Sequence, residues 1–185
     1  MDAFLFHIIN NFSGKSIFGD QVFAFCATVL GNVVIALAIL FLVFHKENKE
    51  WFSSSALAFK KRFFEGVTIF SGGVLAWGIT KIIKMIIARP RPFEVLNDAH
   101  QLVPETLLES FPSNHATFFM AMAIGILLFH KKPGKLFLAL AVIISISRIL
   151  VGVHYPSDIL AGWGIGILSA VFVRYIFLKI FKIEL

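Results

Sequence analysis

Long apolar segments recur along this chain and leave it few ways to fold. Five of them, at about 22–44, 66–88, 113–129, 136–153 and 157–178, consist mainly of Phe, Ile, Leu, Val and Ala. A helix needs about 20 such residues to cross the hydrocarbon core of a bilayer. A spanning segment must also satisfy its own backbone hydrogen bonds, which an α-helix does. The pattern therefore predicts an all-α, polytopic transmembrane helix bundle with about five spans.

The composition excludes a soluble globular domain. Of the 185 residues, 58% are apolar and 15% are charged, and the mean hydropathy is +0.84. Soluble domains are roughly 45–50% apolar and about 25% charged. We expect one integral-membrane domain over residues 1–185. The apolar run 4–9 is too short to span and predicts a short N-terminal interfacial helix.

Lysine and arginine residues are distributed unevenly between the ends of the predicted spans. Eleven lie on one side: Lys46, Lys49, Lys60, Lys61, Arg62, Lys131, Lys132, Lys135, Arg174, Lys179 and Lys182. The positive-inside rule places that side in the cytoplasm. Because the positive residues flank spans, the net charge of +6 gives no reason to expect a nucleic acid partner.

Three short fragments place charge at span ends, where a bilayer should exclude it. They are Lys84-x6-Arg91-Pro92, Pro112-Ser113-Asn114-His115 and Ser147-Arg148-x5-His154-x3-Asp158. A charged side chain near the bilayer core costs a few kcal/mol, so such residues are functional candidates. Under the predicted topology all three fragments fall together on the outer side.

The cations of the first and third fragments, together with the helix start in the second, have the chemistry of a phosphate site. Arg91 and Arg148 offer planar forks to phosphate oxygens, and Lys84 offers a point charge. Taken alone, Lys84 could instead extend to the membrane interface. Pro112 suits the first turn of a helix, whose free backbone N–H groups bind anions. His115 could pass a proton to a leaving oxygen, although the same residues also fit an ordinary helix start.

His154 and Asp158 are four residues apart, which puts them on one face of a helix. A carboxylate bonded to one imidazole nitrogen fixes the tautomer and leaves the other nitrogen as a nucleophile. The alternative is a capping aspartate beside an interfacial histidine. The pair therefore indicates a candidate nucleophile, set beside the three cations.

Together the fragments resemble the signature of the type 2 phosphatidic acid phosphatase superfamily, Lys-x6-Arg-Pro, Pro-Ser-Gly-His and Ser-Arg-x5-His-x3-Asp. The resemblance implies a membrane-embedded lipid phosphatase that forms a phosphohistidine and needs no metal or other cofactor. It implies that His154 is the nucleophile, Asp158 its orienting partner and His115 the general acid. The implied phosphate ligands are Lys84, Arg91, Ser113, Asn114 and Arg148. Asn114 stands where the family usually has Gly, which affects how closely phosphate can approach that backbone.

Within the family, the short chain and compact acidic loop are similar to bacterial undecaprenyl-diphosphate phosphatases. That similarity implies a multi-pass protein of the bacterial inner membrane. The lysine and arginine asymmetry predicts that its site faces the periplasm or cell exterior. Lipid A 1-phosphatases and phosphatidylglycerophosphate phosphatases share the three motifs and remain alternatives. Arg89 lies outside the motif frame. It is either an interfacial arginine or a clamp for a second phosphate.

Two functions of other classes remain to be weighed. A non-enzymatic lipid or anion transporter could use the same charges, but transport needs no His–Asp pair at helical spacing. A vanadate haloperoxidase has a similar site, but those proteins are soluble. The expected partners are a lipid phosphate substrate and the phospholipid bilayer, and the sequence indicates no particular oligomeric state.

Overall fold

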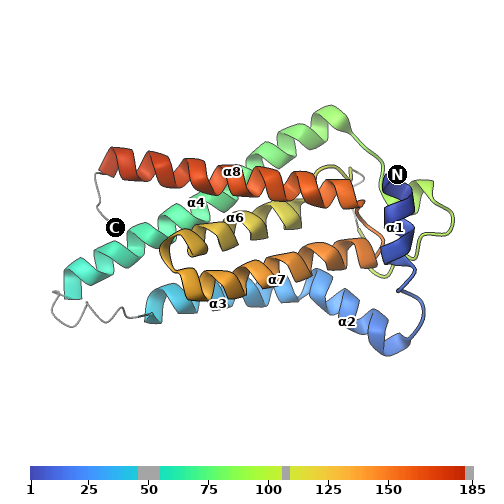
Figure 1. Ribbon diagram of the computed structural model, residues 1–185, viewed down its shortest axis with the longest axis horizontal. Helices are drawn as coiled ribbons and strands as arrows, with labels where there is room; N and C mark the ends of the chain where they lie inside the picture. The colour runs from blue at the N-terminus through green and yellow to red at the C-terminus, as the bar shows by residue number, and fades with distance from the viewer. Residues whose placement is uncertain (46–54, 106–108, 182–185) are drawn as a thin grey trace.

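The computed structural model describes residues 1–45, 55–105 and 109–181. Every regular element in these ranges is an α-helix, which confirms the all-α prediction. Figure 1 shows the helices forming an elongated bundle. They are α1 (Asp2–Asn10), α2 (Ile17–Thr28), α3 (Leu30–Phe44), α4 (Ser55–Ile87), α5 (Pro92–Val95), α6 (Asn114–Phe129), α7 (Lys131–Leu150) and α8 (Pro156–Phe181).

Helix α6 lies at the centre of the bundle, packed against α4, α7 and α8. Nine of its 16 residues are buried. Its approach to α8 depends on two glycines of α8. A Cβ added at Gly162 would lie 2.9 Å from Thr117 Oγ1, and one at Gly166 would lie 2.6 Å from the Thr117 carbonyl oxygen. These small residues let the two backbones pack closely, as in other membrane helix pairs.

The predicted count of five spans is not confirmed. In the described residues, three helices are long and apolar enough to cross a bilayer, at Phe59–Ile87, Lys131–Leu150 and Pro156–Ile180. A fourth span is possible if the pair α2 and α3, bent by 48°, counts as one. Helix α6 has only 16 residues, about 24 Å at 1.5 Å per residue. Since it is enclosed by other helices, it can be apolar without being long enough to span.

The bend between α2 and α3 has a local cause that the apolar pattern does not reveal. The Thr28 hydroxyl donates to the Ala24 carbonyl at 2.7 Å, and such back-bonding often bends helices. At the same place, Arg148 NH1 donates to the Ala27 carbonyl at 3.0 Å. A side chain bonded to helix carbonyls is a recognised source of kinks.

Two predicted helix boundaries have different outcomes. Helix α4 ends at Ile87, close to the predicted end of its span at 88 and before Pro90 and Pro92, and Ala88 takes a left-handed φ of 45°. The interval between the predicted spans 113–129 and 136–153 is mostly helical, because α7 already begins at Lys131. Proline is compatible with the first turn of a helix, so Pro133 lies inside α7 and does not interrupt it.

The two ends of the bundle differ in what they carry. Figure 1 shows the start of α4, the α6–α7 turn and the end of α8 at one end, and α1 at the other. The first group of elements holds the described lysines and arginines of the predicted cytoplasmic side. Lys46, Lys49 and Lys182 lie outside the described residues. The helix predicted near the N-terminus is α1 (Asp2–Asn10), and its interfacial position stays a prediction.

Candidate active site

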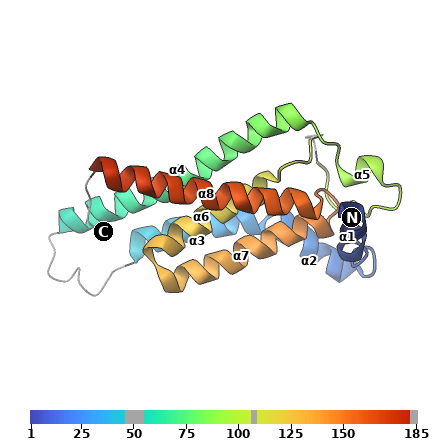
Figure 2. The same ribbon diagram turned by 45° about the horizontal axis from the view of Figure 1, so that its top comes forward.

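The segment between α4 and α6 brings the three charged fragments together. It crosses the end of the bundle that carries α1 (Figure 2). Within it, Leu102 N–H donates to the Val151 carbonyl at 3.2 Å, and Ser113 N–H donates to the Asp158 carbonyl at 3.1 Å. These bonds join the segment to the end of α7 and the start of α8. Residues far apart in sequence therefore meet in one site.

The three motif cations are almost completely buried at this end. Lys84, Arg91 and Arg148 expose only 2–3% of their surface. Lys84 Nζ donates to the Glu109 carbonyl at 2.6 Å, and Arg91 NH1 donates to the Val153 carbonyl at 2.8 Å. Buried cations need counter-charges or hydrogen bonds to be tolerated. Carbonyl oxygens supply part of this, and an anion can supply the rest.

A carboxylate already lies between the two arginines. Glu105 Oε2 is 2.5 Å from Arg148 NH2 and 3.7 Å from Arg91 NH2. A carboxylate oxygen resembles a phosphate oxygen in its preference for guanidinium donors. Glu105 therefore marks a position where an anion is stabilised. Glu105 could not be recognised from the sequence, because no fixed spacing ties a loop carboxylate to the motifs.

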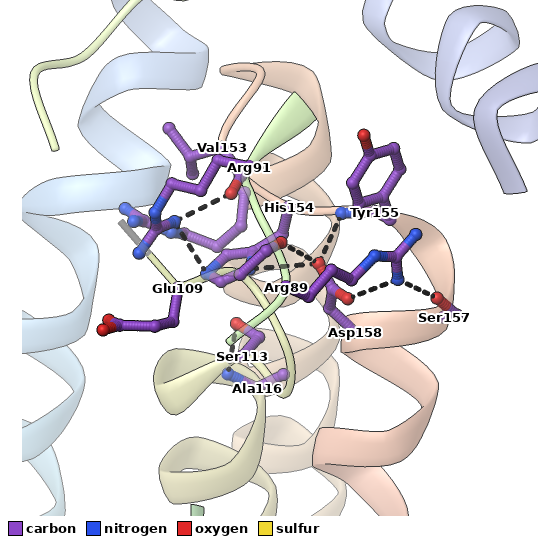
Figure 3. A network of polar contacts seen from close by, with 12 residues as sticks. Arg89, Arg91, Glu109, Ser113, Ala116, Val153, His154, Tyr155, Ser157 and Asp158 are labelled. Carbon is purple, nitrogen blue, oxygen red and sulfur yellow. Dashed lines mark hydrogen bonds and ion pairs between the residues drawn. The ribbon is translucent and has the colours of Figure 1, made fainter. Parts of the chain in front are cut away.

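His154 lies between a carboxylate and a cation. Its Nδ1 is 3.4 Å from Asp158 Oδ2, and its Nε2 is 3.4 Å from Arg91 NH1 (Figure 3). Burial lowers the pKa of His154 to about 3, although the bond to Asp158 opposes the shift. The ring is therefore neutral at pH 7. If Nδ1 carries the proton toward Asp158, the Nε2 lone pair points to the cationic side.

Asp158 is fully buried and is held by several donors. Its Oδ2 accepts from the Tyr155 N–H at 2.8 Å and from the Ser110 hydroxyl. Its Oδ1 accepts from Arg89 NH1 at 2.9 Å. These donors keep the carboxylate ionised and fixed in place, which is what an orienting partner for His154 requires.

The fragment Pro112-Ser113-Asn114-His115 opens α6 beneath this cluster. Ser113 is the N-cap, and its hydroxyl oxygen accepts from the Ala116 N–H at 3.4 Å. The His115 ring interacts electrostatically with Arg148, Glu105 and Arg91. Within the described part of the chain, two buried polar atoms have no hydrogen-bond partner, Asn114 Oδ1 and Arg148 Nε. The site thus keeps one hydrogen-bond acceptor and one donor without a partner among the described residues.

Arg89 is placed differently from the three motif cations. Its guanidinium contacts Asp158, Ser157 and Asp2. Its role as a clamp for a second phosphate stays a prediction. The contacts of its guanidinium are with other residues of this chain, so they do not test binding of a phosphate. The contact between Arg89 and Asp2 could not be predicted from the sequence, because 87 residues separate them.

The fold and the site together define an integral membrane helical protein with a buried cluster of cations and a neutral histidine beside it. Comparison with known proteins then identifies the family. The PAP2 superfamily profile matches residues 65–182, well over half of the chain. The chain therefore belongs to the PAP2 superfamily.

The relatives agree with this assignment. The chain is 27% identical over 179 residues to undecaprenyl-diphosphatase BcrC of Bacillus subtilis, covering 97% of this chain and 83% of the relative. It is 43% identical over 100 residues to the bacitracin transport permease protein BcrC of Bacillus licheniformis, covering 54% of this chain and 49% of that relative. The crystal structure of Aquifex aeolicus LpxE matches with a TM-score of 0.71 and 25% identity, covering 94% of each chain. The family and its phosphatase-named relatives support a lipid phosphatase.

Proposed function

We propose that this protein hydrolyses a lipid phosphate or diphosphate ester through a phosphohistidine at His154. The observation that carries the proposal is the setting of His154, with Nδ1 on Asp158 and Nε2 facing Arg91. A neutral imidazole held in one tautomer beside a fixed cation is an activated nucleophile placed at an anion site.

In the first step, the substrate phosphate replaces the Glu105 carboxylate between Arg91 and Arg148. His154 Nε2 attacks phosphorus, so that a P–N bond forms and the P–O bond to the leaving group breaks. His115 gives its proton to the leaving oxygen. Lys84, Ser113 and the backbone at Asn114 contribute donors to the phosphoryl oxygens, whose negative charge they stabilise in the transition state.

In the second step, water attacks the phosphohistidine. His115 takes a proton from that water, the P–N bond breaks, and inorganic phosphate leaves. His154 returns to its neutral form, and His115 regains the proton that it gave to the leaving group. Asp158 stabilises the charge that the His154 ring carries while it is phosphorylated.

The substrate that we propose is undecaprenyl diphosphate. The support is the relative from Bacillus subtilis, which is named an undecaprenyl-diphosphatase and aligns with nearly the whole chain. Lipid A 1-phosphate and phosphatidylglycerophosphate remain alternatives within the family. Phosphate release by the purified protein should be measured on all three lipids and on phosphatidic acid, and the highest kcat/KM should fall on the prenyl diphosphate.

Transport is the second candidate, favoured by the name of the Bacillus licheniformis relative, a transport permease protein. The two candidates differ in a simple way. A transporter moves its ligand unchanged, whereas a phosphatase releases inorganic phosphate from lipid in detergent, where no compartment exists. Absence of phosphate release from every lipid in the panel would favour transport.

The protein is a multi-pass membrane protein, and we propose that it lies in the bacterial inner membrane with its site facing the periplasm or exterior. The support is the distribution of Lys and Arg residues. A cysteine at Asn97, in a Cys26→Ala background, should react with a membrane-impermeant reagent applied from outside. Labelling only after the inner face is exposed would reverse this orientation.

A further inference from the structure

The carboxylate of Asp158 uses its two oxygens for different partners. Oδ2 faces His154 Nδ1 and accepts from Tyr155 N–H and the Ser110 hydroxyl. Oδ1 accepts from Arg89 NH1 at 2.9 Å. A fully buried carboxylate is tolerated when an opposite charge and hydrogen bonds compensate its lost hydration. Arg89 provides that charge, and it determines which oxygen is left to face His154.

Arg89 is itself fixed from several directions (Figure 3). NH1 also donates to Ser157 Oγ at 2.8 Å, and NH2 donates to Asp2 Oδ2 at 2.7 Å. The guanidinium carbon lies 3.9 Å from the centre of the Tyr155 ring, a stacked arrangement that restrains its plane. Together these contacts hold the Arg89 side chain in one orientation.

Asp2 closes the network from the first turn of α1. Besides Arg89, its carboxylate accepts from the backbone N–H of Ser157 at 3.1 Å and from the Ser157 hydroxyl. Asp2 and Arg89 each expose 27% of their side chains, whereas Asp158 is fully buried. Ion pairs therefore connect the partly exposed Asp2, through Arg89, to the buried Asp158 beside His154.

We propose that Arg89 and Asp2 are positioning residues for the histidine nucleophile, acting through Asp158 and not on the substrate. This inference rests on the phosphatase function proposed above. It assigns Arg89 a role that differs from a second-phosphate clamp. A second phosphate at Arg89 would have to displace its bonds to Asp2 and Asp158.

The test compares kcat and KM for a lipid monophosphate and a lipid diphosphate in Arg89→Ala and Arg89→Lys. Loss of positioning should lower kcat by about 10- to 100-fold in Arg89→Ala. KM should change little, and both substrates should be affected alike. Arg89→Lys keeps the charge but not the planar fork, so it should recover part of the lost kcat.

Asp2→Asn provides a milder second variant, because it leaves Arg89 and Asp158 in place. We expect kcat to fall about 3- to 10-fold, again with little change in KM. Asp98→Asn is its matched control, since Asp98 pairs with His7, another residue of α1. Arg174→Ala controls for Arg89→Ala, because Arg174 also stacks on a ring and bonds to the backbone, but at the other end of the bundle. Both controls should retain wild-type kinetics.

The acid limb of the pH profile gives a readout that a purely structural role would not move. His154 faces the cations Arg91 and Arg148 and the carboxylate of Asp158. Without Arg89, the negative charge of Asp158 acts more strongly on His154 and favours its protonation. The acid limb should then move to higher pH in Arg89→Ala.

A loss confined to the diphosphate would overturn the positioning role and restore the clamp. Unchanged kcat in both Arg89→Ala and Asp2→Asn would overturn it as well. Wild-type protein that releases no phosphate from either lipid would instead refute the proposed function, so the two failures are distinguishable. If Arg89→Ala does not fold, Asp2→Asn and Arg89→Lys still decide the question.

Discussion

The Nε2 atom of His154 lies 3.4 Å from NH1 of Arg91, on the side of the ring opposite Asp158. Arg91 also approaches the carboxylate of Glu105, which joins it to Arg148. A phosphate bound by these arginines would therefore lie next to the nitrogen proposed to attack it. Holding the reacting atoms in such proximity supplies a large part of the rate enhancement of an enzyme.

Replacing His115 with Ala should slow departure of the leaving group more than attack. A general acid typically contributes about 10²- to 10⁴-fold to the rate, and an aryl phosphate, whose leaving group needs no proton, should partly escape this loss. The measurement is kcat/KM on a lipid phosphate and on an aryl phosphate. Equal losses on the two substrates would contradict the acid role. His100→Ala, a change in an exposed loop histidine, is the control.

Glu105→Gln should strengthen inhibition by inorganic phosphate or vanadate. The carboxylate neutralises Arg91 and Arg148 and competes with an incoming anion, whereas an amide does not neutralise them. We expect the inhibition constant to fall about 3- to 10-fold, in keeping with the net contribution of one typical hydrogen bond. Glu94→Gln is a matched control, because Glu94 accepts from the backbone N–H of Arg91 at 2.9 Å. Weaker inhibition in Glu105→Gln would show that Glu105 does not occupy the anion position.

The buried His154 should make folding stability depend on pH. Its pKa is lowered to about 3 in the folded protein, against about 6.5 in an unfolded chain. Between these values the unfolded state binds more protons, so stability is lost as the pH falls from 6.5 toward 3. The free energy of unfolding in detergent should drop by about 1–2 kcal/mol between pH 7 and pH 5.

His154→Gln should weaken that pH dependence, while His100→Gln should leave it unchanged. Stability is plotted against pH for wild type, His154→Gln and His100→Gln. Comparing the three slopes separates the contribution of His154 from that of the other titrating groups. Equal slopes in wild type and His154→Gln would mean that His154 is not held neutral by burial.

The sequence allowed parts of the fold to be predicted because they depend on local pattern. Apolar segments predicted the main helices, and the spacing of four residues predicted that His154 and Asp158 would face each other. The break near Val29 and the short central helix α6 could not be predicted from the apolar pattern, since each depends partly on neighbours distant in the chain. Arg148 reaches the carbonyl of Ala27 at the break, a contact that no local spacing indicates.

The same distinction applies to the candidate site. Its motif residues have fixed spacings, and the structure brings them to one end of the bundle. Glu105, Ser110 and Asp2 lie in a loop or at a helix start, and tertiary packing alone brings them to the motif residues. Their roles became visible only from contacts such as that between Arg89 and Asp2.

The phosphohistidine mechanism can be tested by trapping the covalent intermediate. Protein mixed with a lipid diphosphate that carries ³²P in its terminal phosphate should be quenched in base, digested and mapped. We expect an acid-labile, base-stable phosphohistidine on the peptide that contains His154. His154→Ala should fold, carry no label and turn over at least ~10³-fold more slowly. Label on another residue, or near-normal turnover by folded His154→Ala, would contradict the phosphohistidine mechanism.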